Sequence, residues 1–505
     1  MTLAVWAEAF ATLMQPSVFL YLMVGVLLGV VIGALPGLSA TMGIALITPI
    51  TFWLPKADGF AMMMGLWNAA IFAGGITAIL INTPGTPASI TQAFDGYALY
   101  KQGKGGLALG INTVFSFVGG MVSILMLILF AEPIAKFTIK FGSAEYFMIA
   151  LFGLSMMVAV AGEDILKGLI LGMVGILLST VGIDPINGTM RFTFGSTSLS
   201  AGIDFIPVMI GLFGTAEVIY QIYDRNKANE EAEHEQRKKN LALGRMLPSA
   251  KEMGRLTPRC IVVGLVATII GAIPAAGGDI SAVICWGNSK KMSKEGDLYG
   301  KGSIEGLAVS SAANNGVIGG AMTTMLTLGL PGDSVTAILL GSLTMYGLTP
   351  GSSMFTTNAT FTAQVMILMV MANLAFLIIG LLTSKFTAKV LNIAQPTVWT
   401  AVSVLCVVGS YCINNRFSDV ILMLTMGVLG FFFKVYKFPT GPLVLGLLLG
   451  STMEKNMRRA LVISRGNWAY FVTQPISCVI LLLVVVTFCA PFILKLVKRG
   501  KKQEA

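Results

Sequence analysis

The chain has 505 residues, of which 55% are hydrophobic and only 11% are charged. Because soluble domains carry about 25% charged residues, this composition excludes an ordinary soluble protein and predicts an integral membrane protein. We interpret the formal net charge of +10 as loop charge that orients the chain in the membrane, with no nucleic-acid partner expected.

Five apolar segments are long enough to cross a lipid bilayer, which takes about 20 residues per helix. They lie near residues 17–35, 106–130, 203–223, 360–384 and 475–494. The expected fold is therefore an all-α polytopic membrane protein.

The sequence offers little for catalysis. His234 is the only histidine, and the six cysteines are scattered without a Cys-x-x-Cys pair. The His-Glu-x-x-His, Gly-x-Ser-x-Gly and Walker A patterns are absent, so zinc hydrolases, serine hydrolases and P-loop ATPases have no motif here. We expect neither an enzyme nor a bound cofactor.

The first interruption of an apolar helix lies at Pro36-Gly37, and Ser39 and Thr41 follow it. Proline removes a backbone donor and glycine loosens the chain, so a helix must stop here and a new one begin. Glycines at every fourth position precede the break, which is typical of close helix packing. They are Gly25, Gly29 and Gly33.

A second interruption lies at 82–87, within the apolar run 78–100. At membrane depth, irregular backbone is tolerated only where protein buries it or where it lines a wet cavity. The amide and hydroxyls of this break therefore predict the wall of a polar site. Together with Ser39 and Thr41, its candidate substrate-binding residues are Asn82, Thr83, Pro84, Gly85, Thr86 and Ser89.

Residues 224–259 hold nine basic and six acidic residues and are too polar to span a membrane. We interpret them as a solvated linker between two halves. The predicted divisions are a first membrane repeat at 1–223, this linker, a second repeat core at 260–390, additional C-terminal transmembrane helices at 391–494 and a basic tail at 495–505.

The half after the linker repeats motifs of the first half in the same order. Gly33-Ala34-Leu35-Pro36 is matched by Gly271-Ala272-Ile273-Pro274, and Asn68 before Gly74-Gly75 by Asn314-Asn315 before Gly319-Gly320. Pro84-Gly85 is matched by Pro331-Gly332. The candidate substrate-binding residues of the second copy are Pro331, Gly332, Ser334 and Thr336.

Loop charge predicts that the two copies have inverted topology. The loop at 290–301 holds four lysines where its counterpart at 55–59 holds one, whereas Lys101 and Lys104 have an uncharged counterpart at 346–353. By the positive-inside rule, equivalent loops then lie on opposite sides of the membrane. The linker and the C-terminal tail are expected in the cytoplasm and the N-terminus outside. Residues 304–345 must then hold one span plus a broken or re-entrant helix.

The segments around the breaks contain no basic side chain that could hold an anion. Arg and Lys are absent from 36–54, 60–100, 274–289 and 304–345. A carboxylate would have to bind at helix N-termini, whose free N–H groups and positive dipole end favour negative charge. For Thr86, Ser89 and Ser334, simple N-capping is an equally good interpretation.

Oxygen atoms near the same breaks are candidates for holding a coupling cation, as expected in inverted-repeat transporters. A carboxylate at membrane depth is costly, which favours a cation or proton role for two of them, although Asp333 could also be an N-cap. The asparagines could equally form interhelical hydrogen bonds. The candidate positions are Asn68, Asp279, Asn314, Asn315 and Asp333; Asp95 is assigned to the cytoplasmic rim.

The ordered motifs resemble the large membrane subunit of the tripartite tricarboxylate transporters, the TctA-type family, over about residues 17–470. The resemblance is carried by GALPGLSAT at 33–41, FAGGITAILINTPGTPAS at 72–89, FDGYALYKQGKGGLALG at 94–110 and NNGVIGGAMTTMLTLGLPGDS at 314–334. One position departs from the family pattern: Pro274 is followed by Ala275 where the family tends to have glycine.

The resemblance implies a secondary transporter of the bacterial inner membrane that imports a small di- or tricarboxylate by alternating access, coupled to Na⁺ or H⁺. It also implies two partners, a small TctB-type membrane subunit and a periplasmic TctC-type solute-binding protein. The alternative is a receptor-independent permease or exporter for another small organic solute. A membrane-embedded enzyme would need the missing motifs, and a scaffold subunit would not need two polar breaks.

Overall fold

The computed structural model describes residues 1–35, 37–83, 85–160, 165–184, 187–225, 245–274, 277–390 and 395–487, without the side chains of residues 87, 156–160, 224–225, 279, 384–390 and 395. Within these ranges the chain is almost entirely helical, with one antiparallel hairpin of β1 (Gly182–Ile183) and β2 (Met190–Arg191). Eight described helices are long and apolar enough to cross a membrane. The predicted all-α polytopic membrane fold is confirmed.

The candidate spans extend those predicted from apolar runs. Four of the five predicted segments lie in helices of sufficient length, and the fifth is described only as far as residue 487, as the shorter helix Pro475–Thr487. The remaining four spans contain polar residues, so they do not stand out as uninterrupted apolar runs in the sequence. They are Lys56–Ile81, Ala250–Gly271, Pro396–Asn414 and Phe417–Val435.

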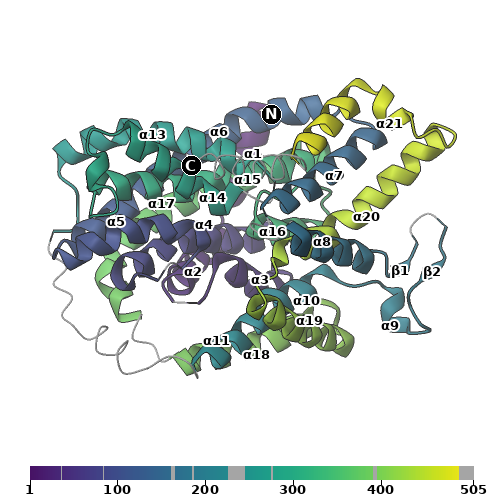
Figure 1. Cartoon of the computed structure of the whole chain (residues 1–505), viewed down its shortest axis with the longest axis horizontal. Helices are drawn as coiled ribbons and strands as arrows, with labels where there is room; N and C mark the ends of the chain where they lie inside the picture. The colour runs from purple at the N-terminus through teal and green to yellow at the C-terminus, as the bar shows by residue number, and fades with distance from the viewer. Residues whose placement is uncertain are drawn as a thin grey trace, which may run out of the picture.

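Five helices occur twice in the same order, alternating long and short (Figure 1). The first set is α2 (Pro16–Gly33), α3 (Ala40–Thr51), α4 (Lys56–Ile81), α5 (Ile90–Lys101) and α6 (Gly105–Thr138). The second set is α13 (Ala250–Gly271), α14 (Gly277–Met292), α15 (Ile304–Leu328), α16 (Ser334–Met345) and α17 (Ala359–Val390). This recurrence follows the order of the matched motifs; the inversion of the second set across the membrane stays a prediction.

Helices α4 and α15 form the buried centre of the fold, and nearly all their residues are buried. They are joined where Asn315 Nδ2 donates to the Asn68 carbonyl oxygen at 3.3 Å, across a sequence separation of 247. A residue that contacts its own counterpart is what a pseudo-two-fold axis between the two helices would produce.

Both central helices end in the same way, again 247 positions apart. Helix α4 is followed by the C-cap residue Asn82, with φ of 56°, and α15 by the C-cap residue Gly329, with φ of 70°. A left-handed residue turns the chain sharply while its N–H satisfies a carbonyl of the last helical turn. The breaks predicted around residues 84 and 331 therefore follow directly on helix ends.

The glycine stripe of α2 packs against α4, as predicted. A Cβ atom added at Gly25 would lie 2.1 Å from the Met62 carbonyl oxygen, and one at Gly29 would lie 2.4 Å from that of Leu66. Any larger residue would separate the two helices, which is the role of small residues in membrane helix pairs.

The loops of the two sets gather at opposite ends of the fold. At one end Gln102 Nε2 donates to the Lys301 carbonyl oxygen at 3.0 Å, so the two lysine-rich loops meet. At the other end the rings of Phe52 and Tyr346 stack with centroids 5.0 Å apart, which joins the two loops of low charge. Figure 1 shows α5 at the lysine-rich end, far from the β1–β2 hairpin.

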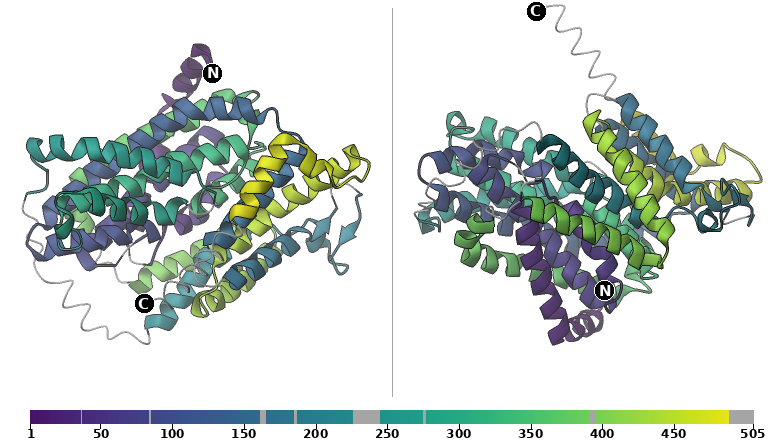
Figure 2. Two further views of the ribbon diagram at one scale, coloured as in Figure 1. Left: turned by 45° about the horizontal axis from the view of Figure 1, so that its top comes forward. Right: turned by 90° about the horizontal axis from the view of Figure 1, so that it is seen from below.

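The remaining helices surround this core, and Figure 2 shows the hairpin at the edge of the molecule beside the yellow C-terminal helices. Helix α20 packs on α7 and α8, and α18 and α19 pack on η2. These elements are α1 (Leu3–Leu13), η1 (Pro87–Ser89), α7 (Ser143–Val160), α8 (Ile165–Ser179), α9 (Thr197–Ser200), α10 (Phe205–Met209), η2 (Ile210–Thr215), α11 (Ala216–Arg225), η3 (Gly296–Leu298), η4 (Ser352–Phe355), α18 (Gln395–Asn414), α19 (Phe417–Val435), α20 (Thr440–Ile463) and α21 (Tyr470–Thr473).

Helix α13 begins inside the stretch that was predicted as linker. Ser249 and Glu252 form a capping box, which fixes the start of the helix at Ala250 because each side chain satisfies a backbone N–H of the first turn. Residues 226–244 of the predicted linker and the tail 495–505 lie outside the described residues.

Candidate functional site

A cavity of about 340 Å³ lies where the helix breaks of both sets meet. The first turns of α3, α14, α16 and α20 form its wall, together with η1, the middles of α4 and α15, and Phe213 of the π-helical stretch η2. The described residues that line it include no lysine and no arginine. Its polar side chains are Ser39, Thr41, Thr86, Asn314, Asp333, Ser334 and Thr440.

The positive potential in this cavity comes from helix N-termini. Each helix begins with N–H groups that have no partner inside the helix, and its dipole places about half an elementary charge there. Ser39 caps α3 by accepting from the Met42 N–H at 3.2 Å. Helix N-termini are a known type of anion site, and four of them border this cavity, where Asp333 already accepts from the Thr336 N–H of α16 at 2.7 Å.

Two buried polar atoms at the cavity have no hydrogen-bond partner. Thr86 is 6% exposed and Asn314 is 0% exposed, and both Thr86 Oγ1 and Asn314 Oδ1 are unpaired. Asn314 Nδ2 donates to the Ile71 carbonyl oxygen at 3.0 Å, so its amide oxygen is the free atom. Because buried polar atoms are normally paired, these two indicate a site for a ligand.

Thr86 and Asp333 occupy equivalent places in the two helix sets. The Thr86 N–H donates to Ser89 Oγ at 3.1 Å, and that hydroxyl donates to the Thr86 carbonyl oxygen at 2.7 Å. The Asp333 N–H donates to Thr336 Oγ1 at 2.9 Å, and that hydroxyl donates to the Asp333 carbonyl oxygen at 3.0 Å. The same turn therefore presents a hydroxyl to the cavity in the first helix set and a carboxylate in the second.

The structure brings six of the predicted site residues to the cavity wall: Ser39, Thr41, Thr86, Asn314, Asp333 and Ser334. Ser89 and Thr336 lie one turn behind, where their hydroxyls hold the two turns just described. The capping interpretation is confirmed for Asp333, which caps α16, whereas Ser89 makes no side-chain capping bond to α5. Asn82 and Thr83 are exposed at the end of α4 and do not line the cavity. Pro84, Ala275 and the Asp279 side chain lie outside the description.

Gly85, Pro331 and Gly332 are buried behind the cavity. A Cβ at Gly85 would lie 2.7 Å from the Gly33 carbonyl oxygen, and one at Gly332 would lie 2.7 Å from that of Gly271. Their close approach is therefore to the protein backbone, in the same way in both sets.

Asn68 and Asn315 lie on α4 and α15 without lining the cavity. Asn68 Nδ2 donates to the Met64 carbonyl oxygen at 2.9 Å, and Asn315 joins the two helices as described above. The Asn315 bond matches the interhelical interpretation, whereas the Asn68 side chain bonds within its own helix. The amide oxygens of both residues are buried and unpaired.

Sequence reasoning missed the N-terminus of α20. Pro439, Thr440, Gly441 and Pro442 line the cavity, although they lie far beyond the second helix set. Their composition, two prolines around a threonine and a glycine, matches that of residues 84–87. This similarity is the signal that could have found them.

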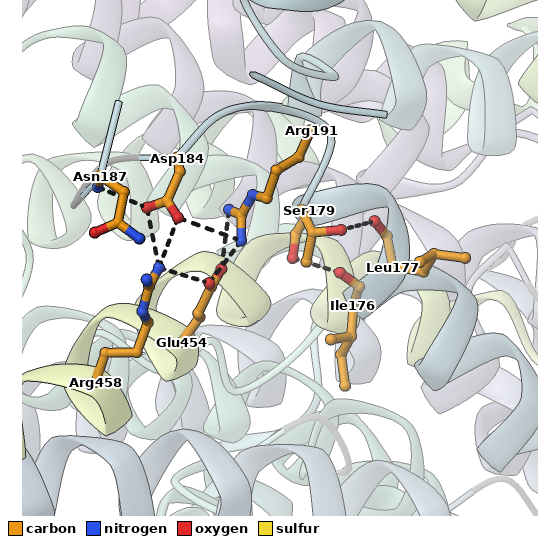
Figure 3. Close-up of polar contacts among 9 residues, drawn as sticks. Ile176, Leu177, Ser179, Asp184, Asn187, Arg191, Glu454 and Arg458 are labelled. Carbon is orange, nitrogen blue, oxygen red and sulfur yellow. Dashed lines mark hydrogen bonds and ion pairs between the residues drawn. The ribbon is translucent and has the colours of Figure 1, made fainter. Parts of the chain in front are cut away.

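A group of four charged side chains fixes the other half of α20 (Figure 3). Arg191 donates to both oxygens of Glu454 at 2.7 and 3.1 Å, and Arg458 donates to both oxygens of Asp184 at 3.0 and 2.8 Å. Hydrogen bonding to Glu454 raises the pKa of Arg191, so the paired guanidinium stays charged. This network ties α20 to the β1–β2 hairpin and so holds the helix whose first turn lines the cavity.

Broken helices that enclose a polar cavity define the class: a polytopic membrane protein built like a secondary transporter. The family model described as the Tripartite tricarboxylate transporter TctA family matches residues 19–445, and the chain belongs to this family. It is therefore a component of a tripartite tricarboxylate transporter, and the resemblance found in the motifs is confirmed.

Two relatives from Agrobacterium vitis are similar to this chain. An uncharacterized 52.8 kDa protein in the TAR-I ttuC' 3'region is 34% identical over 472 residues, which cover 94% of this chain and 92% of the relative. An uncharacterized protein in the TAR-II ttuC' 3'region is 32% identical over 214 residues, which cover 42% of this chain and 88% of the relative. No solved structure matches the chain significantly.

Proposed function

We propose that this chain is the large permease subunit of a binding-protein-dependent secondary transporter, which imports a small di- or tricarboxylate by ion-coupled alternating access. A TctC-type protein delivers the carboxylate from the periplasm, and a small TctB-type subunit completes the complex in the bacterial inner membrane. The linker and the C-terminus face the cytoplasm, and Na⁺ or H⁺ supplies the coupling.

The observation that carries this proposal is the cavity of about 340 Å³. Its volume falls within the range of small-molecule sites, about 300–1,000 Å³. Four helix N-termini and the free hydroxyl of Thr86 can donate to carboxylate oxygens, which matches an anion held without arginine or lysine. An uncharged polar solute would gain little from several helix N-termini, because their positive dipole ends favour negative charge.

Alternating access also requires closure on one side of the cavity, and the contacts at the lysine-rich end support it. Asp95 Oδ1 accepts from the backbone N–H groups of Gly300 and Ser303, each at 2.8 Å. Asp95 Oδ2 accepts from Trp286 Nε1 at 2.8 Å. These bonds join α5 of the first set to α14 and the following loop of the second, so the two sets are closed together at the side proposed to be cytoplasmic.

Dependence on the binding protein distinguishes this proposal from the receptor-independent permease. Cells that express the two membrane subunits should accumulate radiolabelled citrate or succinate only when the TctC-type protein is present, because delivery by the receptor loads the cavity. The control is the same cells with an equal amount of membrane complex and an unrelated periplasmic binding protein. Full uptake without the TctC-type protein would favour the receptor-independent alternative.

A further inference from the structure

A second cavity, of about 260 Å³, lies between α7, α8, α20 and the short helix Pro475–Thr487. Among the described residues that line it, Ser155 has the only polar side chain. The Ser155 hydroxyl already donates to the Phe152 carbonyl oxygen at 2.8 Å. The described wall therefore offers no free side-chain donor or acceptor to an ion, a carboxylate or a sugar.

The cavity is long and narrow. Pro442 and Met453 of α20 both line it, and they lie about 16 Å apart along the helix axis because each residue of a helix rises by about 1.5 Å. On α8, Gly168 and Ile176 both line it, two turns apart. This shape fits an extended apolar chain better than a compact ring.

The outer edge of the cavity lies among side chains that face the bilayer. Met173 of α8 lines the cavity and is 65% exposed, and Ile170 and Leu177 beside it are 47% and 56% exposed. On the other edge Val484 lines the cavity, and its neighbour Val485 is 51% exposed. In a protein with eight candidate membrane spans, such an exposed apolar surface contacts lipid tails.

The physical chemistry of the wall selects an apolar occupant. An apolar cavity stays dry, and an engineered one of about 150 Å³ binds benzene, so this larger cavity has room for a longer apolar group. If it were empty, the side chains around it would lose their dispersion contacts on one side. A single side chain of a partner protein would fill only part of a cavity that extends along three turns of α20. The tails of the surrounding bilayer have the required length and chemistry.

We propose that this cavity binds an acyl chain of a membrane phospholipid. Pro442 lines both this cavity and the polar one, so the bound chain packs against the first turn of α20, whose Thr440 lines the polar cavity. The lipid thereby supports one wall of the polar cavity from behind. The assignment is independent of which solute the polar cavity holds.

The test is photo-crosslinking of the purified full chain in nanodiscs of phosphatidylethanolamine and phosphatidylglycerol, with a small fraction of a phospholipid that carries a diazirine on its acyl chain. Mass spectrometry then locates the adducts. Pro442 is buried, so a lipid at the outer surface does not reach it, and an adduct there reports a chain inside the cavity. Ile421 of α19 is 53% exposed and serves as the internal reference for surface lipid. The wild type should give adducts at both residues.

Gly172→Leu should lose the adduct at Pro442 and keep the one at Ile421. An added Cβ at Gly172 would lie 3.8 Å from the Pro442 Cβ, an ordinary contact, so the leucine fills the cavity without separating α8 from α20. Ser155→Leu fills it from α7 and should have the same effect, which keeps the test decisive if one variant fails to fold.

The matched control is Gly254→Leu in α13, where an added Cβ meets no atom within 4 Å; it should label like the wild type. No adduct at Pro442 in the wild type, or an undiminished adduct in folded Gly172→Leu and Ser155→Leu, would overturn the proposal. The same experiment is repeated with the small membrane subunit present. Loss of the Pro442 adduct in that complex would assign the cavity to the partner subunit and would also overturn the lipid site.

Discussion

Gly85→Ala and Gly332→Ala should each destabilise the folded protein by about 1–3 kcal/mol or more, the cost of forcing atoms into a packed interior. The new Cβ at residue 332 would lie 2.5 Å from the Ala321 Cα, and the one at residue 85 would lie 2.8 Å from the Gly74 Cα. Both neighbours are backbone atoms, which cannot move aside alone. Valine at either position should abolish the recovery of folded, monodisperse protein. The thermal unfolding midpoint in detergent measures the effect.

The matched control is Gly254→Ala in α13, where an added Cβ meets no atom within 4 Å. In a helix with open space, alanine is favoured over glycine by about 0.5–1 kcal/mol, so this variant should be neutral or slightly stabilised. If Gly85→Ala and Gly332→Ala are both as stable as the wild type, the close backbone contacts described for the two breaks are contradicted.

Asp95→Ala should cost about 1–3 kcal/mol or more, because the buried carboxylate satisfies donors on α14 and on the following loop at once. Removing it leaves Trp286 Nε1 and the N–H groups of Gly300 and Ser303 without their partner. The Ser303 bond is buried and the other two are partly buried, and a fully buried unsatisfied group costs about 1–3 kcal/mol. We expect a large fall in the thermal midpoint and faster proteolysis of the loop at 293–303.

The control for Asp95 is Glu295→Gln at the same end of the fold. Glu295 pairs with Arg255 at 2.8 Å on the surface, and exposed pairs contribute about 0–1 kcal/mol. If the thermal midpoint of Asp95→Ala is no lower than that of Glu295→Gln, the bonds of Asp95 do not hold the two helix sets together at the lysine-rich end.

The breaks were predictable because proline, glycine and asparagine act locally on the backbone. Pro331-Gly332 marked a true helix end whatever surrounds it, and matched motifs predicted which helices correspond. The register of the match was less accurate. The motifs pair Gly74-Gly75 with Gly319-Gly320. In the structure, Gly85 packs against the backbone of Gly74 and Gly332 against that of Ala321, so Gly74 corresponds to Ala321. The motif match missed this because either glycine or alanine is small enough for the close approach of the break to the helix.

The composition of the cavity wall was only partly predictable. Which side of a broken helix faces inward depends on tertiary packing, so Asn82 and Thr83 point away although Thr86 lines the cavity. The first turn of α20 lines the cavity through tertiary packing, in a helix whose distant half is tied to the β1–β2 hairpin by Glu454 and Arg458. No local pattern encodes a contact of that kind.

The central claim, that the carboxylate binds in this cavity, is tested most directly by substrate protection of single cysteines. In a background without native cysteines, Thr440→Cys and Thr83→Cys are reacted with a small anionic thiol reagent in the reconstituted complex, with and without saturating citrate or succinate, whichever the uptake assay shows to be transported. The account predicts that the substrate slows labelling at Thr440→Cys and leaves labelling at the exposed Thr83→Cys unchanged. Protection at Thr83→Cys with no protection at Thr440→Cys, in variants that still transport, would contradict it.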